Sequence, residues 1–166
     1  MSTITYTPIG MIHTPFRTAT GTPIQPTSSI DTKGEIEIFP EYVKGIEDLQ
    51  GFSHIFVIYH FHLSGKPLLK VTPFMDEQPR GVFSTRAPTR PNAIGLSIVR
   101  LTNIQENILH IKDVDIIDGT PLLDIKPYVP EFDVRVVSNI GWIKKNIHKL
   151  SKAKDDGRFT CDDKIL

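Results

Sequence analysis

The chain has 166 residues, of which 19 are basic and 19 acidic, so its formal net charge is zero at pH 7. Domains that bind nucleic acid through bulk charge are usually basic, so any contact with RNA must come from a local patch. Hydrophobic residues make up 39%, enough for one globular domain. No run approaches the roughly 20 apolar residues of a membrane span, and no secretory signal opens the chain. We therefore expect a cytoplasmic protein with no membrane partner, and the single Cys161 agrees with a reducing compartment.

The first third of the chain predicts short strands separated by proline-rich connections. Residues 4–16 have strand composition, with prolines that mark bends. Residues 17–29 predict a loop, residues 34–39 alternate as a half-exposed strand does, and residues 41–49 predict one or two helical turns. Residues 53–62 predict the strongest strand, because β-branched and aromatic side chains occupy both of its faces. That strand should therefore lie between two neighbours.

The remainder of the chain continues the same pattern. Further elements are expected as strands at 81–85, 94–103, 108–117, 122–125 and 134–137, and as a helix at 141–153. Several strands, few helices and long proline-rich loops predict a mainly β fold, a closed or partly closed barrel. No GxGxxG follows a strand, so a nucleotide-type ligand would be held by loops rather than by a helix N-terminus. We expect a barrel domain at 1–137, then a short C-terminal helix and a polar tail at 138–166.

An arginine-rich stretch stands out because no acidic residue lies between Gln78 and Gln105. Its arginines are Arg80, Arg86, Arg90 and Arg100. Pro88 and Pro91 rule out a helix interior there, so a stiff loop should join two strands. Guanidinium groups without nearby acids suit a carboxylate, a phosphate or nucleic acid. Composition alone leaves an equal alternative, in which these arginines are solvated or pair with distant acids.

Two long motifs then connect the chain with a known family. The segments GVFSTRAPTRPNAIGLSIVRL at 81–101 and VDIIDGTPLLDIKPY at 114–128 resemble TsaA-like, TrmO-type tRNA methyltransferases, as do 8–16 and 51–54. The resemblance spans residues 4–133. It implies a single small β-barrel of the class VIII methyltransferase kind that uses S-adenosylmethionine (SAM) as cofactor. The implied acceptor is the exocyclic nitrogen of threonylcarbamoyladenosine beside the anticodon of tRNA, and the implied assembly is a homodimer with its active site near the interface.

The resemblance also implies site residues. Those implied to bind SAM are Pro23, Ile24, Gln25, His62, Leu63, Arg86, Leu96, Asp115, Ile116, Ile117 and Asp118. Those implied to be catalytic are Arg86, Asp118 and Tyr128, and those implied to bind RNA are Arg90, Lys126 and Tyr128. Aspartates can accept hydrogen bonds from ribose hydroxyls or an amino group, the two leucines can sandwich an adenine, and Arg86 can orient a carboxylate or phosphate.

Structural alternatives stay open for two of these residues, and the chain departs from its relatives twice. Asp118 precedes Gly119, a common turn pair, and Tyr128 is equally well explained as a core or edge tyrosine. Bacterial relatives have a glutamine where this chain has Leu63, so a side-chain contact there would be lost. Many relatives also continue into a longer C-terminal domain.

Two rival functions remain at this stage. His60 and His62 lie two apart on a strand and face the same way, so they could share a metal with His13, His54 or Asp115 in a hydrolase or oxygenase. The preferred interpretation has no metal. The second rival is a barrel that binds SAM or RNA without turnover, because the sequence contains no unambiguous general base.

Overall fold

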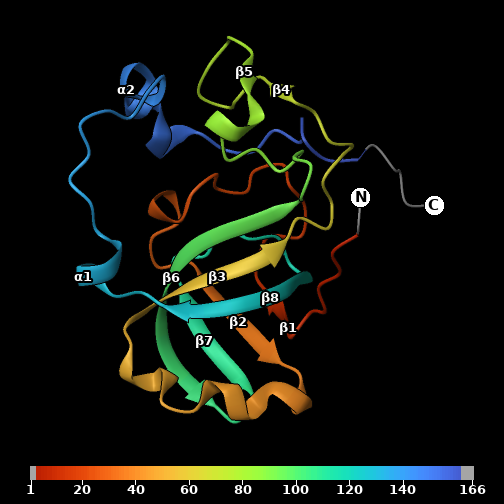
Figure 1. Ribbon diagram of the computed structural model, residues 1–166, viewed down its shortest axis with the longest axis vertical. Helices are drawn as coiled ribbons and strands as arrows, with labels where there is room; N and C mark the ends of the chain where they lie inside the picture. Colours follow the sequence, from red (N-terminus) through yellow and green to blue (C-terminus); the bar gives the residue numbers. More distant parts are fainter. Residues whose placement is uncertain (1–2, 162–166) are drawn as a thin grey trace.

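Six antiparallel strands close into a barrel in the order β1-β2-β7-β6-β3-β8 (Figure 1). The computed structural model describes residues 3–161. The barrel strands are β1 (Gly10–His13), β2 (Lys33–Ile38), β3 (His54–His60), β6 (Ile94–Gln105), β7 (Ile108–Lys112) and β8 (Thr120–Pro127). A separate two-stranded sheet pairs β4 (Lys70–Val71) with β5 (Arg80–Gly81). The expected mainly β barrel fold is confirmed.

Strict alternation along the strands fills the barrel with aliphatic side chains. In β3, Ile55, Val57 and Tyr59 point inward and are buried, whereas the residues between them, from His54 to His60, face outward. The strand lies between β6 and β8, as its two apolar faces predicted. Fully buried side chains inside the barrel include Ile12, Ile36, Ile38, Ile55, Val57, Val99, Leu109, Ile111 and Leu122. A barrel interior filled in this way leaves no space for a ligand, so any site must be built outside it.

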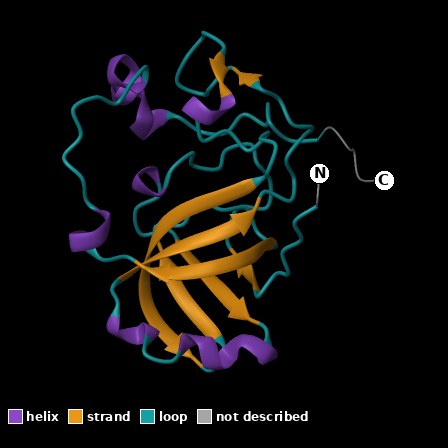
Figure 2. Cartoon of the chain, viewed as in Figure 1, coloured by secondary structure: helices purple, strands orange, loops and turns teal. Residues whose placement is uncertain are grey.

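The two ends of the barrel differ. One end is covered by two 3-10 helices, η2 (Pro40–Ile46) and η3 (Leu49–Gly51), seen at the bottom of Figure 2. Long connections gather at the opposite end, together with all but one of the remaining short helices (Figure 2). These are η1 (Pro26–Ser28), η4 (Val82–Ser84), α2 (Ile143–Asn146) and η5 (Ile147–Lys152). The other, α1 (Pro130–Asp133), follows β8 and lies beside the barrel, away from that end (Figure 1). In the described part of the chain no α-helix exceeds four residues, and none is long and apolar enough to cross a membrane.

The sequence-based boundaries are wrong in several places. Only Gly10–His13 of residues 4–16 is strand, and the strand expected at 81–85 turns into η4 after Gly81. The strand expected at 108–117 ends at Lys112, because Asp113 takes a left-handed conformation with φ 65°. Residues 134–137 form no strand. Composition predicted the extended conformation of these segments but could not tell whether a partner strand lies beside them.

The C-terminal region also differs from expectation. The helix expected at 141–153 is divided into α2 and η5. The tail after it is tied to the barrel loops: the Asp155 amide donates to the Thr22 carbonyl over 2.9 Å, and the Asp155 carbonyl accepts from the Gly21 amide over 2.8 Å. Phe159 is buried against Phe74. The segment that follows η5 is therefore tied to the loop end of the barrel as far as Cys161.

Candidate functional site

A cavity of about 700 Å³ lies at the loop end of the barrel. Its walls come from six places in the chain: the loop before η1, the end of β3, the connection between β4 and β5, the proline-rich loop after β5, the start of β6 and the connection between β7 and β8. The C-terminal segment supplies a further wall through Trp142, Ile143, Ile147, Leu150 and Phe159. A volume of this size suits a small molecule, since ligand pockets run from about 300 to 1,000 Å³.

Most of the predicted site residues meet in this cavity. Those that line it are Pro23, Ile24, Gln25, His62, Leu63, Arg86, Arg90, Leu96, Asp115, Ile116 and Ile117. They span 95 positions of the chain, yet the fold gathers them at one end of the barrel. Asp118, Lys126 and Tyr128 are not among the lining residues.

Arg86 is the cavity's exposed cation. Its Nη1 donates to Gln25 Oε1 over 2.7 Å, a contact between two loops 61 residues apart in sequence. No acidic side chain in residues 3–161 forms a salt bridge with Arg86. The guanidinium thus keeps donors for a carboxylate or phosphate in the cavity.

The other arginines of the acid-free stretch are held by the protein itself. Arg80 pairs with Asp76 over 2.8 Å, and Arg100 pairs with Asp113 over 2.9 Å and with Asp31 over 2.8 Å. The sequence alternative of a distant acid is therefore correct for Arg100, through Asp31, whereas Arg80 pairs with an acid four positions away. Arg90 Nη1 donates to the carbonyls of Thr85 and Ala87, each over 3.1 Å, so Arg90 braces the loop that presents Arg86.

Asp115 stands at the end of a hydrogen-bond chain that runs into the barrel. The Ser97 hydroxyl donates to Asp115 Oδ1 over 2.7 Å, and because Ser97 has one hydroxyl hydrogen, its 3.2 Å contact with the Tyr59 hydroxyl must be donated by Tyr59. Burial raises the pKa of Asp115 to about 6, against the opposing effects of the Ser97 hydrogen bond and the Arg86 charge. Burial also raises the pKa of Tyr59, and the Asp115 charge adds to the effect. The cavity therefore contains a carboxylate whose charge has no basic partner within hydrogen-bond distance among the described residues.

His62 lies directly after β3 and lines the same cavity, half-buried. Its Nδ1 lies 3.3 Å from Thr120 Oγ1, and the Thr120 hydroxyl is also 2.7 Å from the Ile117 carbonyl. Burial lowers the pKa of His62, and the neighbouring His60 lowers it further. The imidazole is therefore neutral at pH 7.

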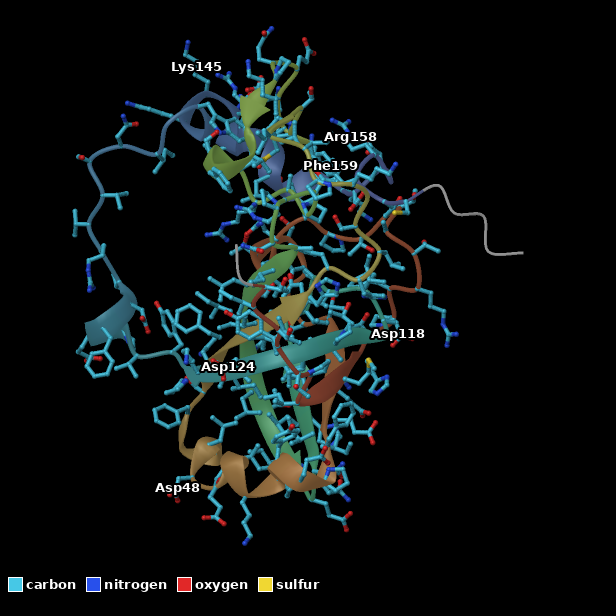
Figure 3. The ribbon with its side chains drawn as sticks, turned by 45° about the vertical axis from the view of Figure 1, so that its right-hand side comes forward. Asp48, Asp118, Asp124, Lys145, Arg158 and Phe159 are labelled. Carbon is cyan, nitrogen blue, oxygen red and sulfur yellow. The ribbon has the colours of Figure 1, made fainter. Side chains whose placement is uncertain are left out.

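Asp118 and Tyr128 lie away from the cavity. Asp118 Oδ1 accepts from the Thr14 amide over 3.0 Å, and the side chain sits at the flank of the barrel in Figure 3. Tyr128 packs edge-on against Phe56, with ring centroids 5.5 Å apart, and its amide donates to the His54 carbonyl. His54 begins β3 and the cavity is reached at Tyr59, near the other end, so roughly 17 Å separate them at 3.3 Å per residue. Asp118 thus lies in a turn and Tyr128 packs as an edge tyrosine, which are the structural alternatives that the sequence analysis left open.

Lys126, expected to bind RNA, lies on β8 near Tyr128. Its Nζ pairs with Asp124 over 2.8 Å, with most of the side chain in solvent. An exposed pair of this kind holds its members weakly, so the lysine can exchange partners.

Several lining residues escaped the sequence analysis. Trp142 closes part of the cavity: its Nε1–H donates to the Ser84 carbonyl over 2.8 Å, and Arg80 lies over its ring. The sequence predicts a helix at 141–153, but nothing local shows that its apolar side chains at 142, 143, 147 and 150 cover a cavity. Ser97 had a detectable signal, because a polar residue at an inward position of β6 needs a buried partner.

The metal alternative requires a cluster of ligands. Within residues 3–161, no group of three or more His, Cys, Asp or Glu side chains is placed to hold an ion. His60 is exposed, whereas His62 turns toward Thr120.

The residues present fit a nucleoside that carries both a cation and a carboxylate. Leu63 and Leu96 supply apolar surface, Asp115 supplies a carboxylate for a cation or hydroxyls, and Arg86 supplies donors for a carboxylate. SAM has these groups. These are its adenosine, its sulfonium and its α-carboxylate.

Comparisons with known proteins agree with this chemistry. The model for the tRNA-methyltransferase O N-terminal domain matches residues 11–134. A probable S-adenosyl-L-methionine-binding protein from Pyrococcus abyssi is 58% identical over 156 residues, which cover 94% of this chain and 85% of that protein. The tRNA (adenine(37)-N6)-methyltransferase of Mus musculus is 35% identical over 167 residues, 96% of this chain but 38% of the mouse protein.

Solved structures give the same picture. The crystal structure of TrmO from Pseudomonas aeruginosa superposes with a TM-score of 0.72 at 35% identity, covering 86% of this chain and 62% of that one. A second TrmO crystal structure gives a TM-score of 0.71 at 39% identity, covering 84% and 64%. The chain thus spans less than two thirds of the solved TrmO chains.

Proposed function

The chain belongs to the tRNA-methyltransferase O N-terminal domain family, and on that premise we propose that it transfers a methyl group from SAM to the exocyclic nitrogen of threonylcarbamoyladenosine beside the anticodon of tRNA. One observation carries the proposal. Ten of the eleven residues that the resemblance assigns to SAM converge on a single cavity of suitable size, from segments far apart in sequence. A cytoplasmic location follows, since tRNA is modified there.

Within this proposal, the chain's own residues hold the donor. Arg86, steadied by Gln25, would bind the donor's carboxylate, and Asp115 would accept from ribose hydroxyls or the amino group. Leu63 and Leu96 would flank the adenine. When bound, SAM supplies the methyl group as an electrophile on a positively charged sulfur.

Alignment is the main contribution of such a site to the rate. The reaction creates no strong oxyanion, so fixed geometry carries most of the catalysis, which in well-oriented cases amounts to about 7–11 kcal/mol. Trp142 and Phe159 cover the cavity from the C-terminal side and keep water from the donor. The closely packed barrel core beneath holds the loops at fixed positions relative to one another.

For tRNA, the proposal keeps Arg90, Lys126 and Tyr128 as contacts, in two separate places. Arg90 lies at the cavity, whereas Lys126 and Tyr128 lie at the far end of β8. A single chain cannot bring both to one nucleotide. In a homodimer, the second copy could present its own Lys126 and Tyr128 beside this cavity.

The homodimer is part of the proposal, and the exposed apolar surface supports it. An arm at residues 129–140 stands out from the rest of the chain between β8 and α2 (Figure 1). Its exposed apolar side chains are Phe132, Val134, Val136, Val137 and Ile140. On β6, Ile94, Leu96 and Ile98 face outward as well. Exposed apolar surface of this kind marks an interaction site, and a second copy of the chain would cover it.

The dimer can be tested without touching the cavity. Val136 is fully exposed, at 103% of its reference area, so Val136→Asp cannot disturb the folded chain. We expect light scattering to give a dimer for the wild type and a monomer for V136D. Leu69→Asp, at another exposed position remote from the arm, should leave the dimer intact. A monomeric wild type at micromolar concentration would contradict the proposal.

The activity is tested with methyl-labelled SAM and two tRNA preparations, one containing threonylcarbamoyladenosine and one with unmodified adenosine. We expect mass spectrometry of the nucleosides to find the methylated product only in the first. Equal methylation of both would show that the acceptor is wrongly assigned. Donor binding without turnover on either tRNA would instead favour the non-catalytic barrel.

A further inference from the structure

The contacts of His62 specify which of its two nitrogens carries the proton. A threonine hydroxyl has one hydrogen to donate, and the short 2.7 Å contact gives that hydrogen of Thr120 to the Ile117 carbonyl. The longer contact, 3.3 Å to Nδ1 of His62, must then be donated by the imidazole. A neutral imidazole has one N–H, so Nε2 of His62 is left as an unprotonated acceptor.

The surroundings of Thr120 and His62 favour this hydrogen-bond arrangement. Thr120 is buried at 3% exposure, and within residues 3–161 its hydroxyl forms hydrogen bonds only with Ile117 and His62. The other titratable group on the same strand end is His60, which is exposed. The charged side chains that line the cavity with His62 are Arg86, Arg90, Asp115 and Asp155.

We propose that His62 is the proton acceptor of the methyl transfer, acting through Nε2, and that Thr120 is the positioning residue that holds the imidazole in the productive tautomer. The inference rests on the proposed function. Asp118 and Tyr128, which the resemblance implied to be catalytic, are not chosen for this role because they do not line the cavity.

The step balances as follows. The acceptor nitrogen forms a bond to the methyl carbon, and the sulfur keeps the electron pair of the bond that breaks, so the sulfonium charge is lost. The proton on the acceptor nitrogen passes to Nε2 of His62, and the imidazolium then releases it to solvent. The lowered pKa of His62, caused by burial and then by His60, agrees with this role, since the base is unprotonated at pH 7 and discharges its proton readily.

The tautomer can be measured without any reaction. In ¹⁵N-labelled protein with no donor or tRNA, long-range ¹H–¹⁵N spectra should show His62 protonated at Nδ1 and bare at Nε2. Thr120→Val keeps the shape of the side chain and removes the acceptor, so the Nε2–H tautomer should become populated. His62 protonated at Nε2 in the wild type would overturn the proposal.

Kinetics test the chemical role. His62→Asn preserves a donor near Thr120 and deletes Nε2, so at saturating SAM the single-turnover rate should fall about 10²–10⁴-fold, the usual contribution of a general base. Because His62 also lines the donor cavity, the Kd for S-adenosylhomocysteine is measured separately, and saturating SAM removes any loss of donor binding from the rate. The acidic limb of the wild-type pH–rate profile should disappear in H62N. In His60→Asn, a matched control at the exposed neighbour, the rate should be retained and the limb should move to higher pH, because one cause of the lowered pKa is gone.

The outcomes separate this inference from the proposed function. If the wild type transfers no methyl to the modified tRNA, the proposed function fails. If the wild type is active but H62N keeps its rate and its acidic limb at saturating SAM, only the role of His62 fails. A raised Kd with an unchanged rate would assign His62 to donor binding alone.

Discussion

Asp115→Asn should make the free protein more stable at neutral pH while weakening its function. In the folded chain burial raises the pKa of Asp115 from 3.8 to about 6. A raised carboxyl pKa means that the folded state disfavours the charge, so stability is fully present below pH 4 and is lost as the pH rises through 6. At 1.36 kcal/mol per pKa unit the full loss is about 3 kcal/mol, and access of water from the cavity reduces it to about 1–3 kcal/mol.

Urea unfolding at pH 4 and pH 7 measures this effect. At pH 4 the wild-type carboxyl is protonated and resembles the amide, so the two proteins should have similar free energies of unfolding. At pH 7 the variant should be more stable by about 1–3 kcal/mol. In calorimetry the variant should also bind SAM at least tenfold more weakly, because it has lost the charge that faces the donor. A difference that is equal at both pH values, or a less stable variant at pH 7, would refute the reasoning.

Asp113→Asn is the matched control, two positions away. Although burial opposes it, hydrogen bonds from Arg100 lower the pKa of Asp113. A lowered pKa contributes stability above the unfolded-state value of about 4, and this is lost as the pH falls. D113N should therefore be less stable than the wild type at pH 7, with the difference shrinking in acid. The two variants should show pH dependences of opposite sign.

Three further substitutions test the site and the barrel. Arg86→Ala should abolish methyl transfer with an unchanged circular dichroism spectrum, and a folded variant with wild-type turnover would remove Arg86 from the site. Gly95→Ala should lower the free energy of unfolding by about 1–3 kcal/mol, because a Cβ there would run into the buried Tyr59 ring; an unchanged urea midpoint would contradict this close approach. Trp142→Phe loses the hydrogen bond to Ser84, worth about 1 kcal/mol, so limited proteolysis should cut residues 138–161 faster, and equal rates would show that the bond does not hold the segment.

The elements that sequence predicted well are those with a strong local pattern. Alternation along 94–103 and the apolar run at 53–62 gave strands β6 and β3 nearly to the residue. The boundary at Lys112 was missed because a single left-handed residue, Asp113, ends the strand, and aspartate tolerates that conformation without any distinctive neighbour. The division between 1–137 and 138–166 stays a prediction, although the family match ends nearby at residue 134.

The cavity, like the strands, could be predicted where it depends on local sequence but not where it depends on contacts between distant segments. The residues that the resemblance assigns to the donor mostly line one cavity, but the resemblance could not reveal that Asp118 and Tyr128 lie outside it. Nor could it reveal that Ser97 donates to Asp115, or that the C-terminal segment walls the cavity. Each of these depends on which segment lies opposite, and that is set only when the barrel closes.

The sequence by itself determined a mainly β chain with loop-built ligand chemistry, because side-chain periodicity, proline and the absence of a glycine-rich phosphate loop are properties of neighbouring residues. Only the tertiary structure decided which charged side chains form ion pairs within the chain and which do not. Arg100 is neutralised by Asp31 from a distant segment while Arg86 pairs with no acid among the described residues, and one threonine hydroxyl selects the tautomer of His62. The physical reason is that hydrogen bonds and ion pairs act over about 3–4 Å, and only the closed barrel brings groups 58 or more positions apart within that distance.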